Sequence, residues 1–144
     1  IDATYKSAFT GTGTDLSGEP TGIPKWNLAF GARVGADVDF GGRVELQIAH
    51  SYRGACRSNS TSVGQGSCGG DFPGFRVGAA QNRTDLRARW ISPGEKLELG
   101  LFANNVFDNR YVDGVNNITW ETLGTPFSSL SSPRFWGGDI RVSF

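Results

Sequence analysis

The sequence contains no methionine, a single histidine and two cysteines, and its 14 basic residues are balanced by 14 acidic ones. Because the formal net charge is +0, no basic field would draw the chain to nucleic acid, and we expect no nucleic-acid partner. A catalytic triad would need His50, the only histidine, and a metal site in the loop of Cys56 and Cys68 would need His50 to reach that loop from the outer end of its strand. We therefore expect no enzyme activity, no bound metal and no cofactor.

Long apolar runs are also missing, and the mean hydropathy is −0.30. No run approaches the roughly 18 residues that mark a membrane-spanning helix, so a helical membrane protein is excluded. A transmembrane β-barrel is not excluded, because its strands are apolar on one side only. The chain shows no signal peptide, and since alternation of apolar and polar residues begins at Ile1, we expect a fragment of a longer protein.

Glycine, at 21 residues, and aromatic side chains, at 12%, favour a β-rich fold in one unit. Residues 26–40 alternate without a slip, and their polar positions include Arg33, Asp37 and Asp39. The apolar positions are Trp26, Leu28, Phe30, Ala32, Val34, Ala36, Val38 and Phe40. Strands of soluble proteins run to about 5 or 6 residues and bilayer-crossing strands to about 9 to 11, so this length favours a membrane strand.

The two sides of this predicted strand suit two different solvents. Its apolar side has aromatic residues at both ends and smaller aliphatic ones between, as expected where rings lie at the lipid headgroups. Its charged side would be costly in a dry core but suits a water-filled interior.

The same alternation recurs in later segments, residues 43–53, 83–90, 97–104 and 136–144, and in a partial strand over residues 1–9. Together they predict about six antiparallel strands, with His50 on the apolar side. Gly41-Gly42 and Ser92-Pro93-Gly94-Glu95 predict tight turns. Long polar loops are expected over residues 10–25, 54–80 and 113–132, so short and long connections alternate, as they do in outer-membrane barrels.

Motifs in the second half of the chain resemble a known family. The string NNVFDNRY at residues 104–111 follows an apolar alternation and is similar to the penultimate-strand signature of TonB-dependent outer-membrane receptors. Pro133-Arg134-Phe135 leads into a last strand ending in Phe144, which also resembles that family. Pro24 and Trp26 are similar to its lead into an earlier strand.

The resemblance implies the C-terminal segment of a 22-stranded transmembrane β-barrel in a bacterial outer membrane. It implies an active transporter for a scarce nutrient, such as an iron–siderophore complex, cobalamin or an oligosaccharide. Energy would come from TonB through an N-terminal plug region that these residues do not include. The expected partners are therefore outer-membrane lipid, the nutrient and TonB.

The resemblance also implies a role for the end of the last strand. Ile140, Val142 and Phe144 are similar to the signal by which the barrel assembly machinery recognises its substrates. A free final strand offers an unpaired backbone edge for templating, and barrel closure removes that edge. An ordinary edge strand ending in an aromatic residue is the alternative.

Other residues allow more than one interpretation. Cys56 and Cys68 lie in one long loop and predict a disulfide in an oxidising compartment. Arg83 and Arg87, which share a strand face with Arg89 and Asp85, could attract an anion or form a solvated wall paired to neighbouring strands. Four loop residues could grip a ligand or pack on one another. They are Phe72, Phe75, Arg76 and Trp120.

Two other functions stay open at this point. A soluble β-sandwich that binds carbohydrate would also show alternating strands and glycine-rich loops. A passive porin would share the barrel wall but not the plug and the energy coupling.

Overall fold

The computed structural model describes residues 3–7, 9, 11, 13, 15, 17–18, 21–56, 78–116 and 127–144. These residues form strands, turns and bridges, and none of them belongs to a helix that could cross a membrane. The chain divides into two compact units. One comprises Ile1–Asn27, Arg53–Gln81 and Arg110–Ser131, and the other comprises Leu28–Tyr52, Asn82–Asn109 and Ser132–Phe144.

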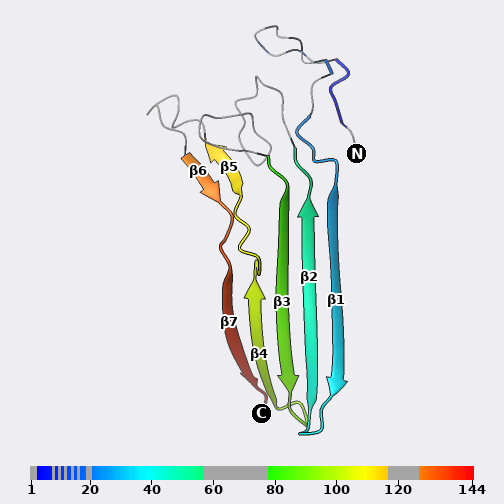
Figure 1. Cartoon of the computed structure of the whole chain (residues 1–144), viewed down its shortest axis with the longest axis vertical. Coiled ribbons are helices and arrows are strands. Elements are labelled where there is room, and N and C mark those ends of the chain that lie inside the picture. The colour runs from blue at the N-terminus through cyan, green and yellow to red at the C-terminus, as the bar shows by residue number, and fades with distance from the viewer. Residues whose placement is uncertain are drawn as a thin grey trace. The chain divides into compact units, whose positions relative to one another are not determined.

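The second unit is an antiparallel sheet of five strands in the order β1-β2-β3-β4-β7, which Figure 1 shows side by side. The strands are β1 (Asn27–Asp37), β2 (Arg43–Arg53), β3 (Gln81–Ile91), β4 (Leu97–Asn104) and β7 (Phe135–Val142). The first three have 11 residues each, which is the length of a strand that crosses a bilayer. The prediction of antiparallel strands is confirmed for these five segments, and β4 and β7 are shorter, with 8 residues each.

The turn between β1 and β2 begins earlier than the sequence pattern predicts. The N–H of Val38 donates to the carbonyl of Gly42 at 3.0 Å, and the N–H of Gly41 donates to the carbonyl of Val38 at 2.9 Å. These bonds reverse the chain after Asp37, so a strand reaching Phe40 is wrong while the turn at Gly41-Gly42 is confirmed.

The predicted turn between β3 and β4 is also confirmed, since the N–H of Glu95 donates to the carbonyl of Ser92 at 2.9 Å. The two turns pack together. A Cβ added to Gly42 would lie 2.2 Å from the carbonyl oxygen of Ile91, and the φ of Gly42 is +89°, so only glycine fits there. Both turns and the C-terminus lie at the same end of the sheet (Figure 1), and the N–H of Ser143 donates to the carbonyl of Lys96 at 2.9 Å.

At its other end, β4 runs into a corner formed by the NNVFDNRY motif. Asn105 and Asp108 have positive φ values of 50° and 52°, and the Asn105 side chain is buried. The Asn105 Nδ2 donates to the carbonyls of Asn109 and Ser132 at 2.9 and 3.0 Å, while its Oδ1 accepts from the N–H of Asn109 at 3.1 Å. Asp108 Oδ1 accepts from the N–H of Arg134 at 2.8 Å. The motif therefore fastens the end of β4 to the segment that leads into β7.

The first unit contains a short antiparallel hairpin, β5 (Val112–Asn116) with β6 (Phe127–Leu130). Apart from Val112, the two strands lie within residues 113–132, which the sequence predicts as loop, so the loop prediction is wrong for residues 113–116 and 127–130. The predicted strand over residues 1–9 is also wrong for its described residues, which form only isolated bridges such as Phe9 with Asp15.

Hydrogen bonds from the Oγ and the N–H of Ser17 hold the pKa of the Asp15 carboxyl below its ordinary value.

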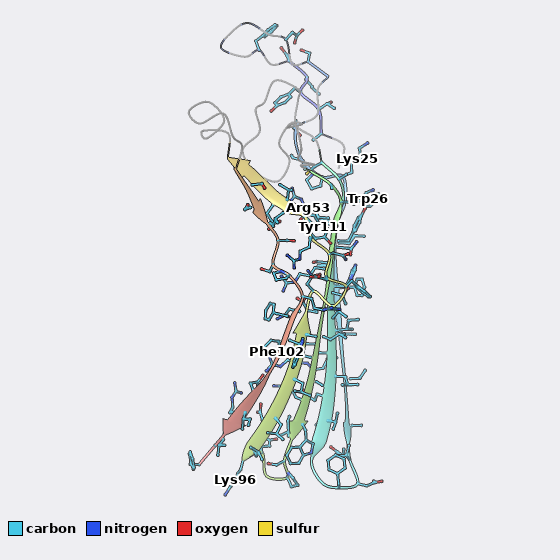
Figure 2. The ribbon with its side chains drawn as sticks, turned by 60° about the vertical axis from the view of Figure 1, so that its left-hand side comes forward. Lys25, Trp26, Arg53, Lys96, Phe102 and Tyr111 are labelled. Carbon is cyan, nitrogen blue, oxygen red and sulfur yellow. The ribbon has the colours of Figure 1, made fainter. Side chains whose placement is uncertain are left out.

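A hydrophobic core is absent from the described residues. Cys56 is the one buried apolar residue among them, and the buried polar residues are Thr84 and Asn105. The stick view shows side chains projecting from both sides of the sheet (Figure 2). Among the described residues of the second unit, no other layer covers either face of the sheet.

Candidate functional site

One face of the five-stranded sheet is apolar across all its strands. The register pairs Leu86 with Ala103 and Ala88 with Leu101, and it continues from Leu99 to Ile140 on β7. These side chains are far from buried: 68% of Leu101 and 73% of Ile140 are exposed. Between them runs an apolar groove. Its lining includes Ala32, Val34, Leu46, Ile48, Leu86 and Ala88.

Aromatic side chains lie at both ends of this apolar face. Near the turns, the rings of Phe40 and Trp90 are 6.4 Å apart, and Trp90 Nε1 donates to the carbonyl of Gly41 at 3.1 Å. Near the corner, Trp136 is paired with Ala103 and is 82% exposed. Rings at the two ends and aliphatic residues between them form the pattern that the sequence predicts for residues 26–40.

His50 lies on the apolar face, as predicted, at the end near the corner. Its Nδ1 is 2.8 Å from the hydroxyl of Thr84, and its ring stacks on Phe30 with centroids 5.0 Å apart. Thr84 is buried, so this hydrogen bond satisfies a polar group that water cannot reach. The described residues contain no group of three or more side chains that could hold a metal ion.

The opposite face carries the charged residues, which form ion pairs between β3 and β2, between β3 and β7 over the intervening β4, and within β3. Arg87 Nη2 donates to Asp139 Oδ1 at 2.7 Å, and Arg89 Nη2 donates to Glu45 Oε2 at 2.6 Å. Arg83 Nε lies 2.9 Å from Asp85 Oδ1 on its own strand. The three arginines are thus each paired with a carboxylate, and their role as a stripe that attracts an anion stays a prediction.

Two glycines make room for side chains on this polar face. A Cβ on Gly100 would lie 2.6 Å from both carboxylate oxygens of Asp139, its register partner. A Cβ on Gly137 would lie 2.8 Å from the ring of Phe102, which is its own partner across the strands. The Asp139 carboxylate and the Phe102 ring therefore lie close over the backbone of the adjacent strand.

A recess that the sequence does not predict lies on the polar face beside Phe102. Figure 2 labels the Phe102 side chain. The rings of Phe102 and Phe135 meet edge to face, with centroids 6.0 Å apart and planes at 80°. The recess has a volume of about 420 Å³. The polar residues that line the recess are Gln47, Asp85, Arg87 and Asn104. The sequence held one signal for it, since Phe102 and Phe135 occupy positions where the alternation calls for polar residues.

The predicted loop ligands and one cysteine lie outside the described residues: Cys68, Phe72, Phe75, Arg76 and Trp120. Cys56 is disulfide-bonded, and its Sγ is 3.2 Å from Nη2 of Arg53. The pairing of Cys56 with Cys68 stays a prediction.

The three residues of the predicted assembly signal are exposed, at 73% for Ile140, 54% for Val142 and 115% for Phe144. Ile140 and Val142 share the apolar face with Leu99 and Leu97, their register partners. They stand on β7, which is the last strand in the order of the sheet.

No family model, no curated protein and no solved structure matches this chain.

Proposed function

We propose that this chain forms part of the wall of a transmembrane β-barrel in a bacterial outer membrane, within a TonB-dependent receptor that imports a scarce nutrient. One observation carries the proposal. The apolar side chains along one face of the sheet are exposed or half-buried, while the paired charges occupy the other face. Such a sheet is stable where hydrocarbon covers the first face and water covers the second.

The distribution of hydrogen bonds supports the same environment. In the described part of the chain, the apolar face has side-chain hydrogen bonds at its two ends, between His50 and Thr84 and from Trp90 to the carbonyl of Gly41. A strand crossing hydrocarbon needs its backbone groups paired with neighbouring strands and apolar side chains between its two interfaces. The five-stranded ladder and the aliphatic middle of this face meet both needs.

The receptor assignment within barrels rests on the NNVFDNRY motif and on the structure that it forms. Asn105 and Asp108 adopt positive φ values, which asparagine and aspartate tolerate better than most residues. The side-chain hydrogen bonds of Asn105 and Asp108 then fix the corner. The motif thus has a structural reason in this chain and supports the resemblance on which the receptor function depends.

In this proposal, the described sheet supplies barrel wall, and Ile140, Val142 and Phe144 form the signal for the barrel assembly machinery. The partners are outer-membrane lipid, TonB and the nutrient. The nutrient would be an iron–siderophore complex, cobalamin or an oligosaccharide.

Fractionation of the intact protein tests the barrel, and uptake tests the receptor. We expect the protein in the outer-membrane fraction, with faster electrophoretic migration before heating than after it. Uptake of the nutrient should stop when the proton motive force is dissipated. Recovery in the soluble fraction would favour the carbohydrate-binding sandwich, and uptake that persists without the proton motive force would favour a passive porin.

A further inference from the structure

We infer that the recess beside Phe102 is a binding site for a neutral oligosaccharide. The inference rests on the proposed function in one respect, because the polar face of the sheet must border water for a sugar to reach it. A volume of about 420 Å³ lies within the range of sites for small ligands.

The aromatic part of the recess is held in place before any ligand arrives. The Phe102 ring lies over the backbone of Gly137, which has no Cβ to displace it, and the edge of one ring meets the face of the other between Phe102 and Phe135. Phe135 remains 46% exposed on a face otherwise given to charged pairs and small residues. Exposed rings on a polar surface provide flat apolar area on which the C–H face of a sugar ring can pack.

The polar groups around the rings have hydrogen-bonding capacity to spare. Arg87 uses Nη2 on Asp139, which leaves other guanidinium donors. Asp85 accepts from Arg83 Nε and from the N–H of Asn105, and a carboxylate has about four lone-pair sites. Donors and acceptors side by side are what hydroxyl groups require, since each hydroxyl both donates and accepts.

The charges of the recess select a neutral ligand over an ion. The Arg87 guanidinium already pairs with Asp139 at 2.7 Å, and Asp85 already pairs with Arg83 at 2.9 Å. A phosphate or carboxylate would have to displace an existing partner, and an unpaired cation would meet arginines. A polyhydroxylated ring would keep both ion pairs intact.

A second recess adjoins the first and provides room for a ligand longer than one sugar ring. It has a volume of about 440 Å³ and shares Ala49 and Asp85 with the first recess. Its lining on this face includes the small residues Ala29, Gly31 and Ser51. Two adjoining recesses, one aromatic and one lined by small side chains, suit an oligosaccharide of two or more rings.

Calorimetric titration of the intact protein in detergent tests the site. The neutral probes are maltotriose, cellotriose, xylotriose and chitotriose, and the charged probes are inorganic phosphate and ferric citrate. We expect at least one neutral trisaccharide to bind. Phe102→Leu, which keeps apolar volume and removes the ring, should weaken that binding roughly tenfold, the equivalent of one lost contact. Phe102→Tyr should retain it, and Asn104→Ala should weaken it severalfold.

The control variant is Leu101→Ala, which removes apolar area from the other face of the same strand and should leave sugar affinity unchanged. The inference would be overturned if no trisaccharide binds, or if the affinity is the same in Phe102→Leu as in the unchanged protein. It would also be overturned if a hydrophilic maleimide cannot reach Asn104→Cys because another part of the protein fills the recess. If the proposed function itself fails, Leu101→Cys in lipid vesicles will react with that maleimide, whereas failure of the sugar site alone leaves Leu101→Cys shielded.

Discussion

Among the described residues of the unit that contains the five-stranded sheet, neither face of the sheet has a covering layer, yet the two faces are built in opposite ways. On one face, Leu101 and Ile140 are more than two-thirds exposed, and their register partners Ala88 and Leu99 are apolar. On the other face, Arg87 with Asp139 and Arg89 with Glu45 form ion pairs across strands. The difference between the faces is what the proposed barrel wall requires, because hydrocarbon offers no hydrogen bonds to side chains and water does.

The largest expected effect comes from putting a charge on the apolar face. Val34→Arg should lower the free energy of unfolding by about 2 to 4 kcal/mol if Val34 lies near the bilayer midplane. The measurement is urea unfolding of the intact protein from lipid vesicles. Asp37→Asn, on the polar side of the same strand, is the matched control and should change little. Equal tolerance of the two variants would break the comparison between the faces.

The next effect concerns the corner that fastens the end of β4 to the segment leading into β7. Asn105→Ala removes a buried amide that serves three hydrogen bonds, and it places alanine at a φ of 50°. Loss of these bonds should cost about 2 to 3 kcal/mol in the same urea unfolding experiment. Asn104→Ala is the control, because the Asn104 side chain is on the polar face and makes none of these three hydrogen bonds. Similar stability of the two variants would mean that the motif does not hold the strands.

A smaller effect is expected where a methyl group is added to the polar face. Gly100→Ala would place a Cβ against the Asp139 carboxylate and disturb its pair with Arg87. Overpacking of this kind should cost about 1 to 2 kcal/mol. In the matched variant Gly138→Ala, the nearest atom is the Gly100 carbonyl oxygen at 3.1 Å, so the loss should be less. A larger loss in Gly138→Ala would show that the apolar face is the more tightly packed of the two.

The smallest expected effect tests whether water borders the polar face of the sheet. The side chains of Arg87 and Asp139 are 42% and 43% exposed, so water should compensate for the loss of either partner. A double-mutant cycle of Arg87→Gln and Asp139→Asn should give a coupling of about 0.5 kcal/mol. A coupling of several kcal/mol would mean a dry face and would contradict the water-bordered surface.

Much of the sheet could be predicted because period-two alternation depends only on neighbouring residues. The segments around Val34, Leu46 and Leu101 each carry the signal in full, and the glycines at 41 and 42 mark the turn. The hairpin of β5 and β6 was missed because Ser128 and Ser129 give β6 little apolar alternation. The prediction also extended β1 to Phe40, because the alternation of apolar and polar residues continues through the residues of the turn.

The site was harder to predict because it depends on register. Phe102 meets Gly137, and Arg87 meets Asp139, only when β4 and β7 pair as they do here. The sequence shows that Phe102 and Phe135 interrupt a polar face but not that their rings meet. The loop residues that the sequence favoured for ligand binding, such as Phe72 and Trp120, lie outside the described residues, so that hypothesis remains a prediction.

The most direct test of the account places spin labels on the two faces of the intact protein in lipid vesicles. Labels at Leu28, Val34 and Ile140 should be relaxed by membrane-dissolved oxygen and protected from a water-soluble nickel complex. Labels at Gln47, Arg87 and Asp139 should show the reverse. Nickel accessibility at Leu28, Val34 and Ile140 without a response to oxygen would contradict a lipid-facing surface on this sheet.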